Sequence, residues 1–182
     1  MIKFIIIAIV VILLIWGVTT YNKLVSLRIK VKEGFSTIDV FLKKRYDLIP
    51  NLVETVKGYA SHEKTTLSDV ISARNKAVSA PIEDKSKAEG ELTNALSRLL
   101  MLTENYPDLK ADKQFINLQD QLKSLESEIE KSRRYYNGTV RELNTTIQKV
   151  PSCIIASIFK FKEEPFFELE NEDERKNVKV EF

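Results

Sequence analysis

The chain has 182 residues, of which 43% are hydrophobic and 30% are charged, and its formal net charge is only +2. This balance gives no basis for nucleic-acid binding, which needs a concentrated basic surface. Five glycines and five prolines are few for this length, so the composition disfavours a turn-rich β fold and favours long helices. The single cysteine, Cys153, cannot form an internal disulfide.

The N-terminal segment MIKFIIIAIVVILLIWGVTTY (residues 1–21) is the strongest signal in the sequence. About 20 apolar residues in a helix cross a hydrocarbon core about 30 Å thick. We expect an uncleaved transmembrane anchor, because no small-residue cleavage site follows; a cleaved signal peptide is the alternative. The residues expected to contact lipid or the membrane interface are Phe4, Ile7, Val11, Leu14, Trp16 and Tyr21.

Basic residues are denser after this anchor than before it. Only Lys3 precedes it, whereas four follow closely: Lys23, Arg28, Lys30 and Lys32. Because positive charge favours the cytoplasmic side, the sequence predicts a cell-membrane protein with its N-terminus outside and its domain in the cytoplasm. These four residues are also placed to attract anionic lipid headgroups, although setting the orientation is the simpler interpretation.

Apolar residues at intervals of three and four predict a first helix that continues from the anchor to just before Pro50. The residue ahead of a proline is disfavoured in helical geometry, so DLIPN (47–51) is predicted to be a break. Asn51 and Glu54 then have the spacing of a capping box, which predicts that the second helix starts at Asn51.

Two later breaks divide the rest of the chain into helices. SAPIED (79–84) is predicted to end the second helix and ENYPDLKAD (104–112) the third, with Asp112 as the N-cap of a fourth helix that ends at Pro151. The pattern predicts an all-α fold, in which an N-terminal transmembrane helix continues into an up-down four-helix bundle with long, kinked helices. We expect the bundle domain to cover residues 22–160 and an extended, acidic, disordered tail to cover 161–182.

The direction of these helices predicts where the chain goes after Pro151. In an up-down bundle the fourth helix returns toward the membrane, and it is long enough to reach the membrane-proximal end. We therefore expect a short amphipathic helix in PSCIIASIFKF (151–161), packed against the base of the bundle near the lipid headgroups. Phe161, Phe166 and Phe167 are expected as further anchors.

No motif in the sequence indicates catalysis. The only histidine, His62, lies in HEKTT, which lacks the second histidine of an H-E-x-x-H zinc motif. Neither a phosphate-binding loop nor a nucleophile elbow occurs. The carboxylates Glu126, Glu128 and Glu130 fall on different faces of a helix and are interpreted as solvated. The sequence therefore predicts no enzyme activity, no metal and no cofactor.

Several polar residues lie on or beside the apolar stripes, where an unpaired polar group would be costly. Buried pairs that fix helix register are the simpler interpretation, and a ligand or partner contact is the alternative. A further hypothesis is an enzyme site built from Arg45, Asp47, His62 and Arg74, which would need a specific kink at Pro50. The candidate network comprises Asp39, Arg45, Asp47, Asn51, Arg74, Arg134, Asn137 and Asn144.

An ordered series of blocks in this sequence resembles the bacterial LemA family. The blocks are residues 21–67, SARNKA, ENYPDLKADKQFINLQDQL, RRYYNGTVRELNT and PSCIIASIFKFKEEPFFE. Departures are small: Gly34-Phe35 stands where an Ala-Trp pair is usual, and Gly138 where an acidic residue is common. The resemblance implies a single-span anchor followed by a helical bundle, usually described in the cytoplasm, and it supplies no catalytic residues.

The resemblance also suggests a setting for the function. Some relatives are linked to building intracellular membranes, and others occur beside membrane proteases. We therefore expect a membrane-anchored, non-enzymatic scaffold or adaptor that acts through protein contacts. The expected partners are the lipid bilayer through residues 1–21, and either a second copy of the chain or other membrane proteins, among them a membrane protease. A membrane-shaping or membrane-surface-binding protein is the alternative function.

Overall fold

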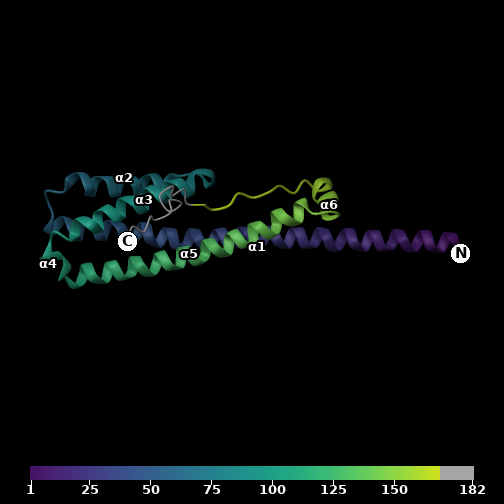
Figure 1. Cartoon of the computed structure of the whole chain (residues 1–182), viewed down its shortest axis with the longest axis horizontal. Coiled ribbons are helices and arrows are strands. Elements are labelled where there is room, and N and C mark those ends of the chain that lie inside the picture. The colour runs from purple at the N-terminus through teal and green to yellow at the C-terminus, as the bar shows by residue number, and fades with distance from the viewer. Residues whose placement is uncertain (169–182) are drawn as a thin grey trace, which may run out of the picture. The chain divides into compact units, whose positions relative to one another are not determined.

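The structure is a computed structural model that describes residues 1–168, except for the side chain of Glu83. These residues form six helices and no strand, so the predicted all-α fold is confirmed (Figure 1). The eight residues 161–168 are in neither helix nor strand, as expected for an extended segment, and the rest of the predicted tail lies outside the described residues. The helices are α1 (Ile2–Tyr59), α2 (Lys64–Ser79), α3 (Ile82–Thr103), α4 (Pro107–Lys110), α5 (Lys113–Gln148) and α6 (Ser152–Ile158).

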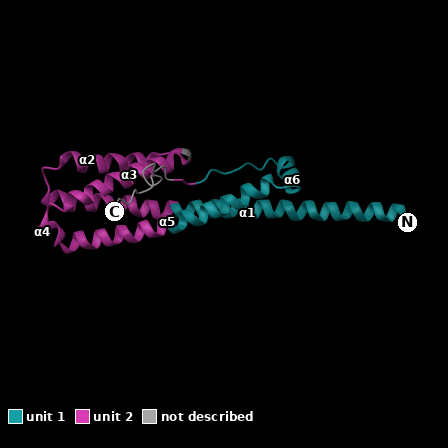
Figure 2. Cartoon of the chain, in the orientation of Figure 1, with its two compact units in different colours: residues 1–38, 131–166 teal, residues 39–130, 167–182 magenta. Residues whose placement is uncertain are grey.

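The chain divides into two compact units (Figure 2). Unit 1 comprises residues 1–38 and 131–166, and unit 2 comprises residues 39–130 and 167–182. The long helices α1 and α5 each contribute one part to both units.

Unit 2 contains, besides the one-turn helix α4, four longer helical segments that alternate in direction. At one end, the hydroxyl of Tyr59 in α1 donates to Asp112 just before α5 (3.0 Å), and the hydroxyl of Tyr106 donates to Glu63 just before α2 (3.1 Å). About four turns away, Arg45 in α1 contacts α3 and α5. This is the up-down order that the sequence predicts. The fully buried core of unit 2 includes Leu42, Ile49, Leu52, Val56, Val70, Leu92, Leu99 and Leu109.

The predicted break at DLIPN is wrong. Helix α1 runs through Pro50 to Tyr59, so Asn51 is an exposed residue inside a helix rather than an N-cap. Burial explains the difference, because Ile49 and Leu52 on either side of this position are completely buried and hold the helix in place. The first break lies instead at residues 60–63, where ASHE connects α1 to α2.

The two later breaks are confirmed. Helix α2 ends at Ser79, ahead of Pro81, and α3 ends at Thr103. The segment ENYPDLKAD also contains the one-turn helix α4. Asp112 caps α5 as predicted, since its Oδ1 accepts a hydrogen bond from the backbone N–H of Phe115 at 2.8 Å.

Unit 1 contains the first part of α1, the second part of α5, α6 and the segment that follows it. The ring of Phe35 meets that of Tyr136 edge-on, with the centroids 5.9 Å apart. The hydroxyl of Tyr136 donates to the carbonyl of Pro165 (2.9 Å). The side chain of Asn144 bonds both the carbonyl and the N–H of Glu164 (2.9 and 3.0 Å). These bonds hold the extended segment against α5.

The predicted short helix near the base of α1 is also present in unit 1. Helix α6 packs beside the end of the apolar segment, where the ring centroids of Tyr21 and Phe159 are 4.6 Å apart. Phe161 also contacts Tyr21, at 5.9 Å between centroids. The other two expected anchors differ, because Phe166 is exposed whereas Phe167 is buried and belongs to unit 2.

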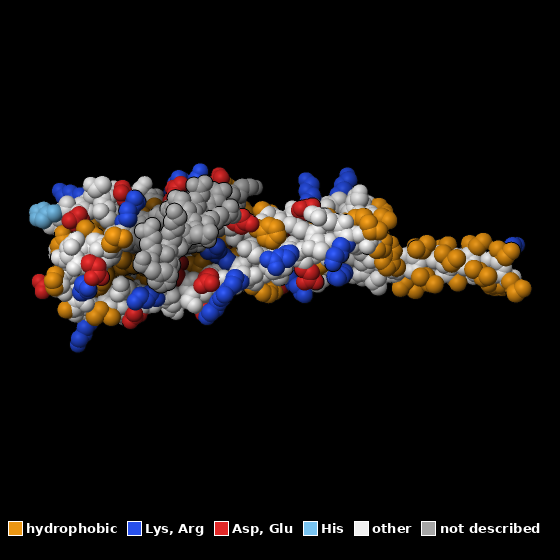
Figure 3. All heavy atoms as spheres, viewed as in Figure 1, with side chains coloured by type: hydrophobic (Ala, Val, Ile, Leu, Met, Phe, Trp, Pro, Cys, Tyr) orange, Lys and Arg blue, Asp and Glu red, His pale blue; other side chains and the backbone are white. Residues whose placement is uncertain are grey.

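The N-terminal part of α1 is long and apolar enough to cross a membrane. An 18-residue stretch has a mean hydropathy of 2.8, and none of it is buried. Hydrophobic side chains cover this part of the helix on the face seen in Figure 3. Of the residues expected to contact a membrane, Phe4, Ile7, Val11 and Leu14 are exposed, whereas Trp16 and Tyr21 are partly covered.

Candidate functional site

A buried ionic cluster lies at the centre of unit 2. Arg45 of α1 is only 2% exposed, and its guanidinium forms ion pairs with Glu89 of α3 and Glu126 of α5. Glu89 is equally buried, whereas the side chain of Glu126 is partly exposed. The hydroxyl of Thr93 lies 3.4 Å from the same guanidinium. A single side chain of α1 is thereby bonded to two other helices.

Tyr46 and Lys85 extend this cluster to α2. The hydroxyl of Tyr46 donates to Glu89, and the ammonium of Lys85 donates to the carbonyl of Ala77 in α2 (3.0 Å). Burial, and next the hydrogen bond with Glu89, raise the pKa of Tyr46 far above its ordinary value of 10.0. Tyr46 therefore stays neutral, and the formal charges of Arg45 and Lys85 balance those of Glu89 and Glu126.

Arg74 of α2 satisfies the backbone group that Pro50 leaves without a partner. Because proline has no N–H, it cannot bond the carbonyl of Tyr46 four residues earlier. The Nε of Arg74 donates to that carbonyl at 2.8 Å. The structure thus brings Arg45 and Arg74 to the same turn of α1. Arg45 belongs to this turn, and the side chain of Arg74 reaches it from α2 by bonding the backbone carbonyl of Tyr46.

The other predicted network residues are not part of this cluster. Asp39, Asp47 and Asn51 are exposed, and Asp47 pairs with Lys43 on the surface at 2.7 Å. The remaining three lie in unit 1, where Arg134 is exposed and Asn137 and Asn144 are partly buried. Of these three residues, Asn144 bonds the backbone of Glu164 and thereby fixes the extended segment after α6.

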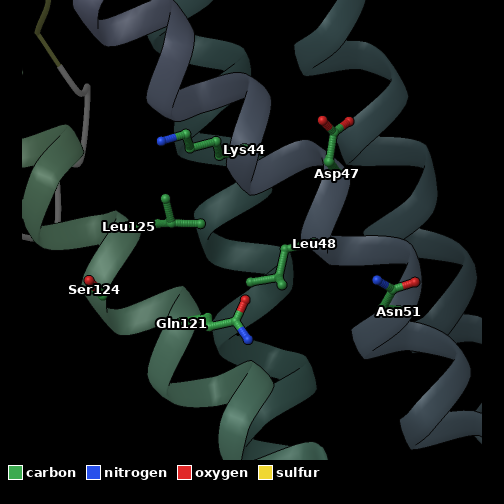
Figure 4. A pocket seen from close by; sticks show the side chains of 7 residues that line it. All are labelled: Lys44, Asp47, Leu48, Asn51, Gln121, Ser124 and Leu125. Carbon is green, nitrogen blue, oxygen red and sulfur yellow. The ribbon is translucent and has the colours of Figure 1, made fainter.

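Asp47 and Asn51 instead line a groove between α1 and α5 in unit 2 (Figure 4). The groove has a volume of about 460 Å³ and is open to solvent. In Figure 4 the side chains of Leu48, Leu125 and Gln121 point into the space between the two helices. An open groove with apolar walls and polar edges suits the side chains of a partner protein better than it suits an enclosed substrate. Its lining is Lys44, Asp47, Leu48, Asn51, Gln121, Ser124 and Leu125.

His62 does not join the hypothetical enzyme site. It is exposed in the connection between α1 and α2. Arg45 lies 14 residues before the end of α1 at Tyr59, which is about 21 Å at about 1.5 Å per residue. Within residues 1–168, no group of three or more His, Cys, Asp or Glu side chains is arranged to hold a metal ion.

Sequence reasoning missed four members of the cluster, Tyr46, Lys85, Glu89 and Glu126. The sequence predicts a solvated Glu126, but its partly exposed carboxylate pairs with Arg45. A signal was present for Glu89, which lies in the apolar stripe of α3, three residues before Leu92 and seven before Leu96. A carboxylate in a stripe position needs a buried cation, and Arg45 occupies the matching position in the stripe of α1.

Comparisons with known proteins identify relatives of this chain. Magnetosome protein MamQ from Magnetospirillum gryphiswaldense is 25% identical over 174 residues, which cover 81% of this chain and 64% of the relative. Protein LemA from Metamycoplasma hominis is 26% identical over 128 residues, covering 69% of this chain and 58% of the relative. The chain therefore spans about three fifths of the length of these relatives.

The family match covers most of the chain. Residues 34–182 match the model of the LemA family, and this range includes all of unit 2 and both the α5 and α6 parts of unit 1. The resemblance noted in the sequence blocks is confirmed, and the chain belongs to the LemA family.

Proposed function

We propose that this chain is a membrane-anchored, non-enzymatic scaffold or adaptor that acts through protein contacts from the cytoplasmic side of the cell membrane. The observation that carries the proposal is the apolar N-terminal part of α1, none of which is buried. Such a segment is unfavourable in water and is stabilised in hydrocarbon, so it supplies an anchor for the helical domain.

The non-enzymatic part of the proposal is supported by the state of the ionic cluster. Arg45 and Glu89 are almost completely buried and bonded to each other, and both terminal guanidinium nitrogens of Arg45 are used to join helices, whereas its Nε has no hydrogen-bond partner among the described residues. A general acid or base must reach a substrate, and these groups face other helices instead. Of the two carboxylates that pair with Arg45, Glu126 at the edge of the cluster is the one with substantial solvent contact.

The groove between α1 and α5 is the surface that we propose for protein contacts. Its polar edge, with Lys44, Asp47, Asn51 and Gln121, offers both donors and acceptors around the apolar Leu48 and Leu125. The partner is a second copy of the chain or another membrane protein, such as a membrane protease.

Photo-cross-linking in intact membranes tests this proposal. We would place a photoreactive residue at Lys44 or at Ser124 in the groove, with exposed Lys57 in the same unit as a matched control. The proposal predicts a defined adduct of fixed mass from both groove positions and not from position 57. Recovery of uncross-linked monomer from every position would overturn it, and identical adducts from all three would show contact without specificity.

Membrane-surface binding is the second candidate function. The observation that favours it is the exposure of all four basic residues that follow the apolar segment. Replacing Lys23, Arg28, Lys30 and Lys32 with glutamine separates the two roles of this charge. An altered orientation, measured by protease protection in membrane vesicles, would indicate a topological role. Unchanged orientation with weaker retention of anionic lipid would indicate surface binding.

A further inference from the structure

We propose that α6 is a second membrane-contacting element, whose exposed apolar face lies in the headgroup region of an anionic bilayer beside the point where α1 enters it. This inference rests on the proposed anchoring by α1. It adds a defined site, the surface formed by Ile154 and Ile158 of α6 and by Phe159 directly after it, and a defined ligand class, the anionic phospholipid.

The first observation is the distribution of apolar side chains around α6. Ile155 and Ala156 are buried against the rest of unit 1. Ile154, Ile158 and Phe159 are 54%, 64% and 54% exposed, respectively. Ile154 and Ile158 are separated by four residues and therefore lie on the same face of the helix. The two isoleucines of this short helix and Phe159 directly after it leave an apolar surface that water does not stabilise.

The second observation is the position of α6 along α1. The Cδ1 of Ile155 lies 3.7 Å from the place that a Cβ atom on Gly17 would occupy. The ring of Phe159 packs on that of Tyr21. Residues 17–21 are where the apolar segment gives way to polar residues. Helix α6 is therefore level with the membrane boundary predicted for α1.

The third observation is where the apolar segment becomes less apolar. Phe4 to Val18 carries no polar side chain and forms about 23 Å of helix at about 1.5 Å per residue. Thr19, Thr20 and Tyr21 then extend the span toward the hydrocarbon thickness of about 30 Å. The contacts of Ile155 with Gly17 and of Phe159 with Tyr21 place α6 beside this less apolar end of the span.

The charge near α6 identifies the kind of lipid. Residues 149–162 contain Lys149, Lys160 and Lys162, all exposed, and no acidic residue. Glu163 and Glu164 follow directly, and Glu163 accepts a hydrogen bond from Gln148 at the end of α5 (2.9 Å). The guanidinium of Arg28 lies over the ring of Phe161, 5.1 Å from its centroid. Basic groups at the rim of an apolar surface are typical of elements that bind anionic headgroups.

Continuity with the anchor argues for lipid rather than a protein as the occupant of this surface. If α1 spans the bilayer, the nearest apolar phase to Ile154 and Ile158 is the bilayer itself. No additional partner is needed to cover them.

Site-directed spin labelling of the full chain tests the inference. Cys153 is replaced with Ser, or with Ala if that background loses its helical circular dichroism spectrum. Single cysteines are then introduced at Ile154 or Ile158. The apolar controls are Ile9 within the anchor and Ile29, an equally exposed isoleucine of α1 beyond it. The labelled proteins are reconstituted in vesicles of phosphatidylcholine and phosphatidylglycerol.

The readout is the ratio of collisions with oxygen, which enters lipid, to collisions with a water-soluble nickel chelate. We expect this ratio to be severalfold higher at positions 154 and 158 than at position 29, and highest at position 9. Equal ratios at 154, 158 and 29, with a high ratio at 9, would overturn the role of α6 while leaving the anchor intact. A low ratio at 9 would overturn the anchor itself. In pure phosphatidylcholine we expect the difference between 154 and 29 to shrink, and an unchanged difference would overturn the preference for anionic lipid.

Discussion

Pro50 is accommodated within α1 because a side chain from another helix replaces the bond that proline cannot make. The carbonyl of Tyr46 accepts the Nε–H of Arg74, so this acceptor is not left unpaired. The same turn of α1 directs Arg45 and the phenol of Tyr46 onto Glu89. One turn of α1 thus receives the bond from Arg74 that replaces the missing proline N–H, and it contributes Arg45 and Tyr46 to the buried ionic cluster.

Replacing Arg74 with Met is expected to lower the free energy of unfolding by roughly 1–2 kcal/mol, because the Tyr46 carbonyl loses its donor. In the background Pro50→Ala, the new backbone N–H bonds this carbonyl, and the same replacement should cost clearly less. Chemical denaturation of the full chain in detergent measures both values. Equal losses in the two backgrounds would refute the compensation.

Removing Arg45 is expected to be much more damaging. Arg45→Met leaves the carboxylate of Glu89 buried without its ion pair, which costs roughly 3–5 kcal/mol. The exposed pair of Lys43 and Asp47 is the matched control, and Lys43→Met should cost less than about 1 kcal/mol. Adding Glu89→Leu to Arg45→Met should recover part of the loss. If the single and double variants unfold at the same denaturant concentration, the pair is not what stabilises this site.

Asp112 gives the N-terminus of α5 a pH-dependent stability. The hydrogen bond from the Phe115 N–H, and next that from the Tyr59 hydroxyl, hold the pKa of Asp112 below its ordinary value of 3.8. A folded-state pKa below the unfolded one contributes stability that is complete above the unfolded pKa and is lost as the pH falls through the folded pKa.

Asp112→Ala should therefore destabilise the chain at neutral pH, and its difference from the unmodified chain should shrink as the pH falls below 3.8. Asp112→Asn is the control, because asparagine caps a helix without titrating. Thermal unfolding across this pH range makes the comparison. A constant difference at all pH values would show that the carboxylate charge is unimportant.

At the scale of helices, close packing in unit 1 depends on a glycine in α1. A Cβ atom on Gly34 would lie 3.3 Å from the Cα of Tyr136 in α5, which is a crowded distance to a backbone atom. A Cβ on Gly138 of α5 would meet no atom within 4 Å. The two positions therefore separate the intrinsic cost of glycine in a helix from its use in packing.

Gly138→Ala is expected to stabilise the chain by roughly 0.5–1 kcal/mol, because alanine has the higher helix propensity. Gly34→Ala should show none of this gain, since the new methyl group pushes α1 away from Tyr136. Differential scanning calorimetry of the two variants measures the contrast. A similar gain at both positions would mean that the helices can separate freely.

The helices were only partly predictable from sequence. Breaks at SAPIED and ENYPDLKAD follow from local chemistry, and so does the Asp112 cap, and all three are present. The break at Pro50 was wrong because Arg74, distant in sequence, supplies the compensating donor. The true break at residues 60–63 carries no proline. In the candidate site, Arg45 and Arg74 were recognised as stripe residues, but their partners required knowledge of which helices face each other.

At the scale of the whole chain, the apolar segment and the alternation of helices were readable from the residues. The alternation of helices also predicts the position of α6 correctly, because the length of the last long helix is enough to bring the chain back to the level of Tyr21. The division of the chain into two units within single long helices was not readable. Nothing in the local sequence of α1 or α5 marks the residues where their packing partners change.

Anchoring by the N-terminal part of α1 is tested most directly by alkaline extraction of membranes from cells that make the full chain. We predict that the chain stays in the membrane pellet. The double variant Ile9→Lys, Ile12→Lys should be released, because each lysine near the centre of a span costs about 2.5–3.5 kcal/mol. The control Ile29→Lys, Val40→Lys, at equally exposed apolar positions of the same helix, should remain in the pellet. Release of the unmodified chain, or equal retention of both double variants, would contradict membrane anchoring by this segment.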